Sequence, residues 1–200
     1  MKRLIIAAVA IITATTSLTI KAQSIPGASD EVNTYYQQAL RNVNTAMFNL
    51  AMCYYTGNGV RKSLPEAFKW WERSAQRNLV EGQHNTALCY YNGVGTAVNY
   101  PMAVKWWKRA ADQNHVEAMY NLGLCYASGN GVDQDYAEAV KWYKKAAKKG
   151  LAAAQYELGV CYGKGQGVEE NRDEAVKWLS RASAQDYHLA IELLTKLQSE

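Results

Sequence analysis

A fixed interval of 36 residues recurs through most of this 200-residue chain. The four cysteines of the chain are spaced 36 residues apart, and each is followed by a tyrosine. A period of this length is typical of a repeat protein, in which every repeat buries its apolar face against its neighbours. The recurring residues are Cys53, Cys89, Cys125 and Cys161; Gly57, Gly93, Gly129 and Gly165; Gly59, Gly95, Gly131 and Gly167; Ala67, Ala103, Ala139 and Ala175; and Trp70, Trp106, Trp142 and Trp178.

Each repeat predicts two helices joined by a tight turn. In the third repeat we expect the first helix over residues 118–127, where Leu122 and Tyr126 lie on one side. Gly129 and Gly131 then end this helix, because glycine adopts the positive φ of a turn without steric cost.

The second helix is expected to begin at a polar capping residue, which can accept a hydrogen bond from a free backbone amide. Three of the four caps have a glutamate three residues later, the pattern of a capping box. In the first repeat Ala67, Trp70 and Ala75 mark the buried stripe of this helix. The expected caps are Ser63, Asn99, Asp135 and Asn171, and the expected stops are Asn78, Asn114, Gly150 and Asp186.

The flanking segments keep the same register, so we expect an all-α chain of ten helices. Residues 30–42 match a lone second helix, and residues 188–200 match a lone first helix whose charged residues cap the stack. Capped ends favour a monomer. The expected divisions are a signal peptide at 1–22, a linker and capping helix at 23–43, four repeats at 44–79, 80–115, 116–151 and 152–187, and a capping helix at 188–200.

The N-terminus has the layout of a secretory signal peptide. Lys2 and Arg3 precede an apolar run over residues 4–18, and the small-residue site at residues 20–22 precedes Gln23. An uncleaved anchor is the alternative, but the run is shorter and richer in threonine than a span of about 20 apolar residues requires. We therefore expect an exported protein, periplasmic or secreted.

The basic charge of the chain belongs to this N-terminal segment. The whole sequence has a formal net charge of +4, and residues 1–22 contain Lys2, Arg3 and Lys21 but no acid, so the rest carries only +1. Proteins that bind nucleic acid concentrate lysine and arginine on one face. Nucleic acid is therefore not an expected partner.

The third repeat carries motifs that resemble the Sel-one-like repeat family, a relative of the tetratricopeptide repeats. The resemblance covers residues 44–187, with departures at Gly82, Thr86, Thr96 and Leu179. It implies a right-handed α-solenoid that serves as a scaffold for protein complexes, often exported in bacteria. The motifs are Ala118-x-x-x-Leu122-Gly123-x-x-Tyr126-x-x-Gly129-x-Gly131-Val132 and Ala139-x-x-Trp142-Tyr143-x-x-Ala146-Ala147-x-x-Gly150.

The cysteines are expected to be buried, free thiols. They share one helical position, so successive sulfurs are a whole repeat apart, beyond the roughly 7 Å between Cα atoms that a disulfide spans. Exported relatives rich in cysteine carry two per repeat, whereas this chain has one. Four thiolates this far apart cannot converge on a metal ion either. We expect no metal and no cofactor.

One side of the first helices is the expected partner-binding face. At about 100° per residue, helix positions 3, 7, 8 and 11 form the inner side, and positions 2, 5, 6, 9 and 12 lie opposite. In tetratricopeptide solenoids that opposite face lines the concave groove, and apolar side chains left outside a core mark an interaction surface. The face consists of Phe48, Asn49, Met52, Tyr55, His84, Asn85, Leu88, Tyr91, Tyr120, Asn121, Leu124 and Tyr156.

Structural roles compete with binding at several of these positions. Position 9 and some aromatic residues could instead pack against neighbouring first helices. The repeated asparagines Asn49, Asn85 and Asn121 could hold an extended peptide through both amide groups or could serve a local structural role. The lysine column on the second helices is expected to be a solvated outer face. Its members are Lys69, Lys105, Lys141 and Lys177.

A binding scaffold for a protein or peptide partner is favoured over an enzyme. Exported members of the family have been described as β-lactam hydrolases, but a hydrolase of that kind needs Ser-x-x-Lys, and no serine here precedes a lysine by three residues. His84, His115 and His188 are each expected to stand alone. We expect no catalytic residues, with an envelope or antibiotic-directed hydrolase as the alternative.

Overall fold

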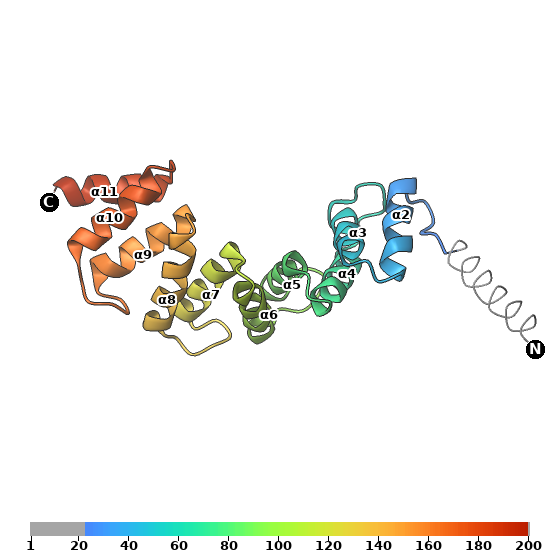
Figure 1. Ribbon diagram of the computed structural model, residues 1–200, viewed down its shortest axis with the longest axis horizontal. Helices are drawn as coiled ribbons and strands as arrows, with labels where there is room; N and C mark the ends of the chain where they lie inside the picture. The colour runs from blue at the N-terminus through green and yellow to red at the C-terminus, as the bar shows by residue number, and fades with distance from the viewer. Residues whose placement is uncertain (1–22, 200) are drawn as a thin grey trace, which may run out of the picture. The chain divides into compact units, whose positions relative to one another are not determined.

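The computed structural model describes residues 23–199, so the expected signal peptide at residues 1–22 lies outside the described range. Ten α-helices and no strand make up the regular structure of this range (Figure 1), which confirms the all-α prediction. The helices are α2 (Asp30–Leu40), α3 (Asn44–Thr56), α4 (Leu64–Gln76), α5 (Val80–Asn92), α6 (Tyr100–Asp112), α7 (Val116–Ser128), α8 (Tyr136–Lys148), α9 (Ala152–Lys164), α10 (Arg172–Ser183) and α11 (His188–Ser199).

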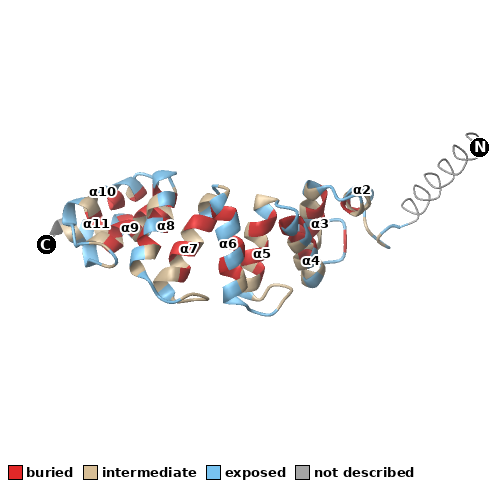
Figure 2. Cartoon of the chain, turned by 60° about the horizontal axis from the view of Figure 1, so that its bottom comes forward, coloured by how far each residue is buried: buried red, intermediate tan, exposed pale blue. Residues whose placement is uncertain are grey.

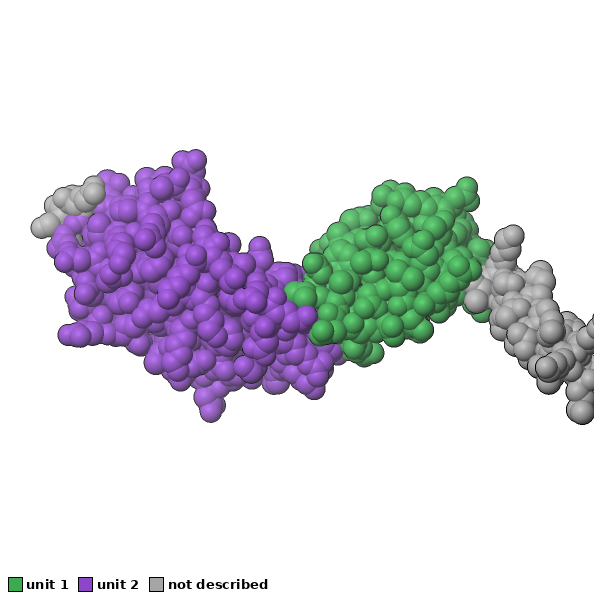
Figure 3. All heavy atoms as spheres, viewed as in Figure 1, with its two compact units in different colours: residues 1–82, 94–96 green, residues 83–93, 97–200 purple. Residues whose placement is uncertain are grey.

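The described chain divides into two compact units (Figure 3). Compact unit 1 contains residues up to 82 together with 94–96, and compact unit 2 contains residues 83–93 and those from 97 onward. The division falls inside α5, whose first turn belongs to compact unit 1. Each unit is therefore described by itself.

In compact unit 1, α3 packs against both α2 and α4. Val32, Met47, Leu50 and Trp71 are buried and form its core. The loop after α3 is tied to the start of α2, because the backbone N–H of Ser29 donates to the carbonyl of Gly59 over 2.7 Å. The lone helix expected before the first repeat is thus an integral part of the packing.

In compact unit 2, each helix from α6 to α11 packs against the next one along the chain. The largest fully buried side chains belong to Trp107, Leu122, Tyr143, Leu158 and Leu179. Figure 2 shows that these helices carry both buried and exposed residues, as amphipathic helices in a stack should. Every helix thus buries one side and leaves another to solvent.

The turn glycines do more than end helices. Gly131 and Gly167 have positive φ values of 80° and 71°, and a Cβ atom on either would overlap the backbone of the preceding repeat's second helix at its first residue, Tyr100 or Tyr136. Only glycine combines this backbone conformation with such a close approach. The second glycine of each pair is therefore a contact point between successive repeats as well as a turn residue.

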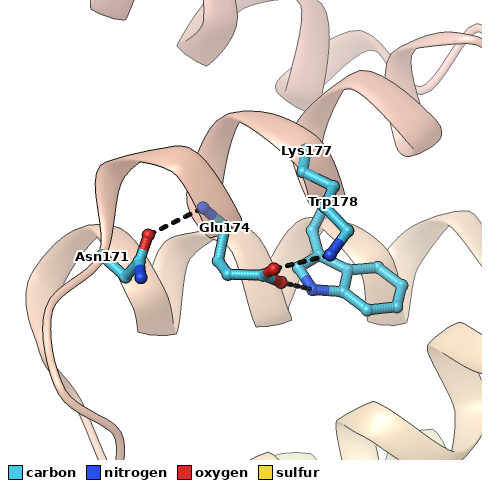
Figure 4. A network of polar contacts seen from close by, with 4 residues as sticks. All are labelled: Asn171, Glu174, Lys177 and Trp178. Atoms are coloured by element: carbon cyan, nitrogen blue, oxygen red, sulfur yellow. Dashed lines mark hydrogen bonds and ion pairs between the residues drawn. The ribbon is translucent and has the colours of Figure 1, made fainter.

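The capping residues are where the sequence predicts them. Ser63, Asn99, Asp135 and Asn171 each accept a hydrogen bond from the backbone N–H three residues later. Figure 4 shows this contact between Asn171 and Glu174. Positive φ values of 68°, 70°, 97° and 58° likewise confirm the stops at Asn78, Asn114, Gly150 and Asp186.

The reciprocal hydrogen bond of a capping box, from the backbone N–H of the cap to the glutamate side chain, does not form in these repeats. The carboxylates of Glu66, Glu138 and Glu174 accept from the lysines three residues later instead of reaching back to the cap. The cap N–H has another acceptor, the carbonyl of the tyrosine that follows the repeat's cysteine. These bonds run from Ser63 to Tyr54 (2.9 Å), from Asn99 to Tyr90 (2.7 Å), from Asp135 to Tyr126 (2.8 Å) and from Asn171 to Tyr162 (2.9 Å).

The inner side of the first helices also differs from the prediction. Tyr54, Tyr126 and Tyr162 at position 11 are only half-buried, because a long side chain near the helix end extends to the surface, where Lys144 lies 5.2 Å from the ring centroid of Tyr162. The cysteines at position 10 are free thiols, as expected. Three are buried, whereas Cys53 is half-buried.

Position 4 of the first helices carries a buried feature that the prediction missed. Gln83 and Gln155 occupy it in the second and fourth repeats, whereas Met47 and Met119 occupy it in the others. The amide of Gln155 accepts from Nε2 of Gln185 (2.9 Å) and donates to the carbonyl of Ala147 (3.2 Å). Gln83 likewise accepts from Nε2 of Gln113 over 2.8 Å. Two repeats therefore use a polar pair where the other two use methionine.

We expect Gln185→Ala to lower the free energy of unfolding by about 1–3 kcal/mol, because it removes the donor to the buried Oε1 of Gln155. Adding Gln155→Met should restore most of this loss, since methionine fills the same position in the third repeat. Urea denaturation followed by circular dichroism measures both effects. A double variant no more stable than Gln185→Ala would contradict the assigned pairing.

Candidate functional site

In compact unit 1, α3 presents four residues of the predicted face. Met52 and Tyr55 are exposed, and Phe48 and Asn49 are half-buried. The ring of Tyr55 lies 5.3 Å from that of Trp71, and Nζ of Lys62 lies 5.9 Å from its centroid. The second helix and the turn thus hold Tyr55 in place, while 41% of it remains exposed to a partner.

In compact unit 2, the predicted face forms a pocket between α5 and α7. Leu88 and Tyr91 of α5 and Asn121 and Leu124 of α7 line it, with a volume of about 220 Å³. Trp107 of α6 forms part of its wall, and Asn92 completes the lining. Four residues predicted from helical geometry are therefore brought together. Trp107 was missed as a lining residue, although it holds the same repeat position as Trp71 and Tyr143.

Aromatic packing accounts for part of the predicted face. Tyr91 contacts the rings of Tyr100 and Trp107 at 5.0 and 5.3 Å, and its hydroxyl accepts from Nδ2 of Asn130 over 3.0 Å. Tyr120 lies 6.1 Å from Tyr143. These tyrosines therefore have structural contacts as well as half-exposed surfaces.

The asparagine column remains available for a ligand. Asn49, Asn85 and Asn121 are half-buried, and no hydrogen bond within residues 23–199 uses their side chains. An asparagine amide offers two donors and an acceptor, and a half-buried amide without a protein partner retains this capacity for a bound chain. Glu157 takes the equivalent position in the fourth repeat, where burial raises the pKa of its carboxyl.

The prediction that each histidine stands alone is wrong for two of them. The rings of His84 and His115 stack with centroids 4.4 Å apart. His115 caps α7 by accepting from the backbone N–H of Ala118, and the repeat geometry brings this cap next to position 5 of the preceding first helix. Tyr156 and Tyr187 occupy the equivalent positions of the fourth repeat, where their rings are tilted with centroids 5.5 Å apart. Burial and the neighbouring His115 lower the pKa of His84 to about 4.

The cysteine thiols are held in their unreactive form. Burial raises the pKa of Cys89 and Cys125 to about 12 and that of Cys161 to about 11. A nucleophilic cysteine requires the opposite shift. Within residues 23–199 there is also no cluster of three metal-ligating side chains, and no helix there is long and apolar enough to cross a membrane.

The second helices form a basic outer face with an arrangement that the prediction missed. The column from Lys69 to Lys177 is exposed, as expected. In addition, a cation lies over the recurrent tryptophan of each repeat, three residues after it. The pairs are Arg73 over Trp70 (5.4 Å), Arg109 over Trp106 (4.7 Å), Lys145 over Trp142 (3.7 Å) and Arg181 over Trp178 (4.7 Å).

Comparison with known families matches the Sel1 repeat, the family that the motifs resemble. The family model matches residues 44–79, 80–115, 116–151 and 152–187. A search among curated proteins finds no match to the chain.

Solved structures show the same fold. A Sel1 repeat protein from Oxalobacter formigenes is 32% identical with a TM-score of 0.79, over 83% of this chain and 68% of that one. The protective antigen c5321 of uropathogenic Escherichia coli, described as having an SLR fold, is 31% identical with a TM-score of 0.80, over 82% of this chain. The present chain covers only 35% of that antigen. Cysteine rich protein B of Helicobacter pylori, at 24% identity and a TM-score of 0.53, shares the fold.

We expect the stability of the chain to fall between pH 6.5 and about 4 through His84. The lowered pKa means that the unfolded chain binds this proton more readily, so the stabilisation is complete above pH 6.5 and is lost as the pH falls toward 4. Phe48 occupies the equivalent position in the first repeat. His84→Phe should therefore reduce the difference in the free energy of unfolding between pH 7.5 and pH 5 by about 1–2 kcal/mol.

Urea denaturation at the two pH values measures this effect, and the variant retains His115 and Glu117, the neighbours that influence the pKa of His84. An unchanged pH dependence in His84→Phe would contradict the assignment.

Proposed function

We propose that this chain, which belongs to the Sel1 repeat family, binds an extended segment of a partner protein along the first helices of its repeats. Members of this family are generally protein-interaction scaffolds. Taken by itself, each compact unit carries half-exposed aromatic, apolar and amide side chains on its first helices.

The pocket between α5 and α7 is the observation that supports this proposal most directly. It combines the apolar side chains of Leu88 and Leu124 with the amide of Asn121, which no other described residue engages. An apolar pocket with one or two placed polar groups is the usual composition of a recognition site. In this arrangement a partner side chain enters the pocket while the amide pairs with the partner's backbone.

The asparagine column extends this mode of recognition from one pocket to several repeats. A backbone segment in extended conformation offers N–H and C=O groups at regular intervals, and an asparagine side chain can pair with both. Asn85 and Asn121 lie on successive first helices, so one segment could engage both. The variable aromatic residues beside them would then set the preference for partner side chains.

We expect a variant with Asn85→Ala and Asn121→Ala to bind selected peptides at least about 10-fold more weakly than the unmodified chain, at about 1 kcal/mol for each lost hydrogen bond. Peptides would be selected from a displayed random library on the unmodified chain and their affinities measured by isothermal titration calorimetry. The matched control carries Lys105→Ala and Lys141→Ala on the outer face and should bind normally.

Equal affinity of the asparagine variant and the unmodified chain would place the binding surface elsewhere. Failure of the library to yield any specific peptide would contradict the proposal as a whole.

We also propose that the protein is exported with removal of residues 1–22. The basic start, the apolar run and the small residues before Gln23 support this inference. Expression of the full chain in a bacterial host should yield a product that begins at Gln23 and lies outside the cytoplasm. N-terminal sequencing and cell fractionation measure this, and an unprocessed product that begins at Met1 would contradict it.

A further inference from the structure

Positive charge is concentrated on two second helices of compact unit 2, α6 and α8. Together with the lysine that follows α8, they contain eight cations and only two acids, a net charge of +6. By contrast, α10 contains three cations and two acids. Residues 23–200 carry +1 in total, so the remainder of the chain has a net charge of −5. The eight cations, here called the lysine-rich face, are Lys105, Lys108, Arg109, Lys141, Lys144, Lys145, Lys148 and Lys149.

The two helices present these cations on one surface. Nζ of Lys108 in α6 lies 5.5 Å from the centroid of the Trp142 ring in α8, and Nζ of Lys145 lies 3.7 Å from the same centroid. The last three lysines of the face and Asp112 of α6 line one hollow of about 480 Å³. Seven of the eight cations are exposed, and Lys144 is half-buried. The charge is therefore open to a ligand that approaches α6 and α8 together.

Neighbouring acids compensate only part of this charge. Lys141 donates to the carboxylate of Glu138 over 2.7 Å. Lys144 lies near Glu174 of α10 and contributes to the lowered pKa of that carboxyl group. Asp112 is the second acid of the two helices and faces the hollow. Three of the eight cations can thus be assigned an acid close by, and most of the net charge remains.

The cations that remain uncompensated are not needed for the fold. Within residues 23–199 the side chains of Lys105, Lys148 and Lys149 make no hydrogen bond, ion pair or ring contact. A cation in the last turn stabilises a helix through its dipole, which accounts for Lys148, but Lys105 lies in the middle of α6. In the fourth repeat, Ala184 and Gln185 occupy the positions of Lys148 and Lys149. The repeat therefore folds without positive charge there.

The composition of the face favours one class of anionic partner. Protein interfaces are poor in lysine and have aromatic or apolar anchors at their centre, whereas Tyr100, at the start of α6, is the only exposed large apolar side chain of these two fully described helices. Arginine, which pairs with phosphates in bidentate geometry and dominates nucleic-acid recognition, occurs here only as Arg109. Lysine is a compact point charge, and each one near an anionic lipid surface adds to the attraction without a fixed geometry.

We propose that the lysine-rich face binds the surface of a bilayer that contains anionic phospholipids. Clusters of about four to eight lysines or arginines are attracted to the negative potential of such a surface. The remainder of the chain, at −5, is repelled by it, so the attraction depends on the face and not on the net charge. None of the eight cations lines the pocket between α5 and α7. The inference is therefore independent of the proposed peptide site, and one molecule can bind a bilayer and a partner segment.

The test uses the chain from Gln23, which contains every described helix, because the apolar run of residues 4–18 would itself enter lipid. Co-sedimentation measures binding to vesicles of phosphatidylcholine alone or with about one-third phosphatidylglycerol. We expect at least about 10-fold stronger binding to the anionic vesicles. Most of this binding should be lost between about 0.1 M and about 0.5 M NaCl, because salt screens exposed charges. Equal binding to the two kinds of vesicle would overturn the proposal.

Matched variants locate the attraction on the face. A variant that lacks three of its uncompensated lysines should bind anionic vesicles at least about 10-fold more weakly, whereas a control that loses three cations elsewhere has the same net charge and should bind normally. Circular dichroism verifies that both variants fold. Equal losses in the two variants would contradict the assignment to α6 and α8. The changes are Lys105→Gln, Lys148→Gln and Lys149→Gln in the first variant, and Arg61→Gln, Lys62→Gln and Lys164→Gln in the control.

Two further measurements separate the bilayer from other partners. A short DNA duplex that binds more tightly than vesicles with the same concentration of negative charge would overturn the proposal in favour of nucleic acid. The variant with Asn85→Ala and Asn121→Ala should retain vesicle binding, because neither residue belongs to the lysine-rich face. Loss of vesicle binding in that variant would place the lipid contact on the first helices, against the proposal, whatever the outcome for peptides.

Discussion

One backbone hydrogen bond, repeated four times, holds each helical hairpin in its shape. The N–H of the cap residue donates to the carbonyl of the tyrosine after the cysteine in every repeat, over 2.7 to 2.9 Å. The bond joins the end of one helix to the start of the next, across a turn that two glycines allow. Because it uses only backbone atoms, side chains can vary without altering the hairpin, provided that the cap side chain still accepts from its own helix.

This independence explains why two pockets of compact unit 2, one between α5 and α7 and one between α9, α10 and α11, differ in chemistry on a constant framework. Between α5 and α7 the pocket has the rings of Tyr91 and Trp107 and the amide of Asn121. Two repeats later the same positions supply no ring and no amide but two lysines. Packing has adapted in parallel, since the buried position 4 alternates between methionine and a glutamine that pairs with a second glutamine.

The features that could be predicted from the sequence are those with local or strictly periodic signals. Caps such as Asn171 and stops such as Asn78 follow from the chemistry of a few adjacent residues, and the face around Asn121 follows from helical rotation. The stack of His84 on His115 and the pair of Gln155 with Gln185 could not be predicted in this way. Their partners are about 30 residues apart, and the distance between two helices is not encoded in the rotation of either one. The partial exposure of Tyr162 depends on the length of its side chain, and the angular position of a residue around the helix carries no information on that length.

The glycines that touch the preceding repeat have a consequence for how such chains change over time. Gly131 and Gly167 meet the main chain of Tyr100 and Tyr136, so the spacing at these junctions is determined by atoms common to all amino acids. A repeat moved to another position would meet the same kind of backbone contact at this glycine, whereas side-chain contacts at the junction, such as Gly82 against Ser74, would have to match. Exchange of whole repeats would therefore preserve the turn contact and confine the necessary adjustment to a few side chains.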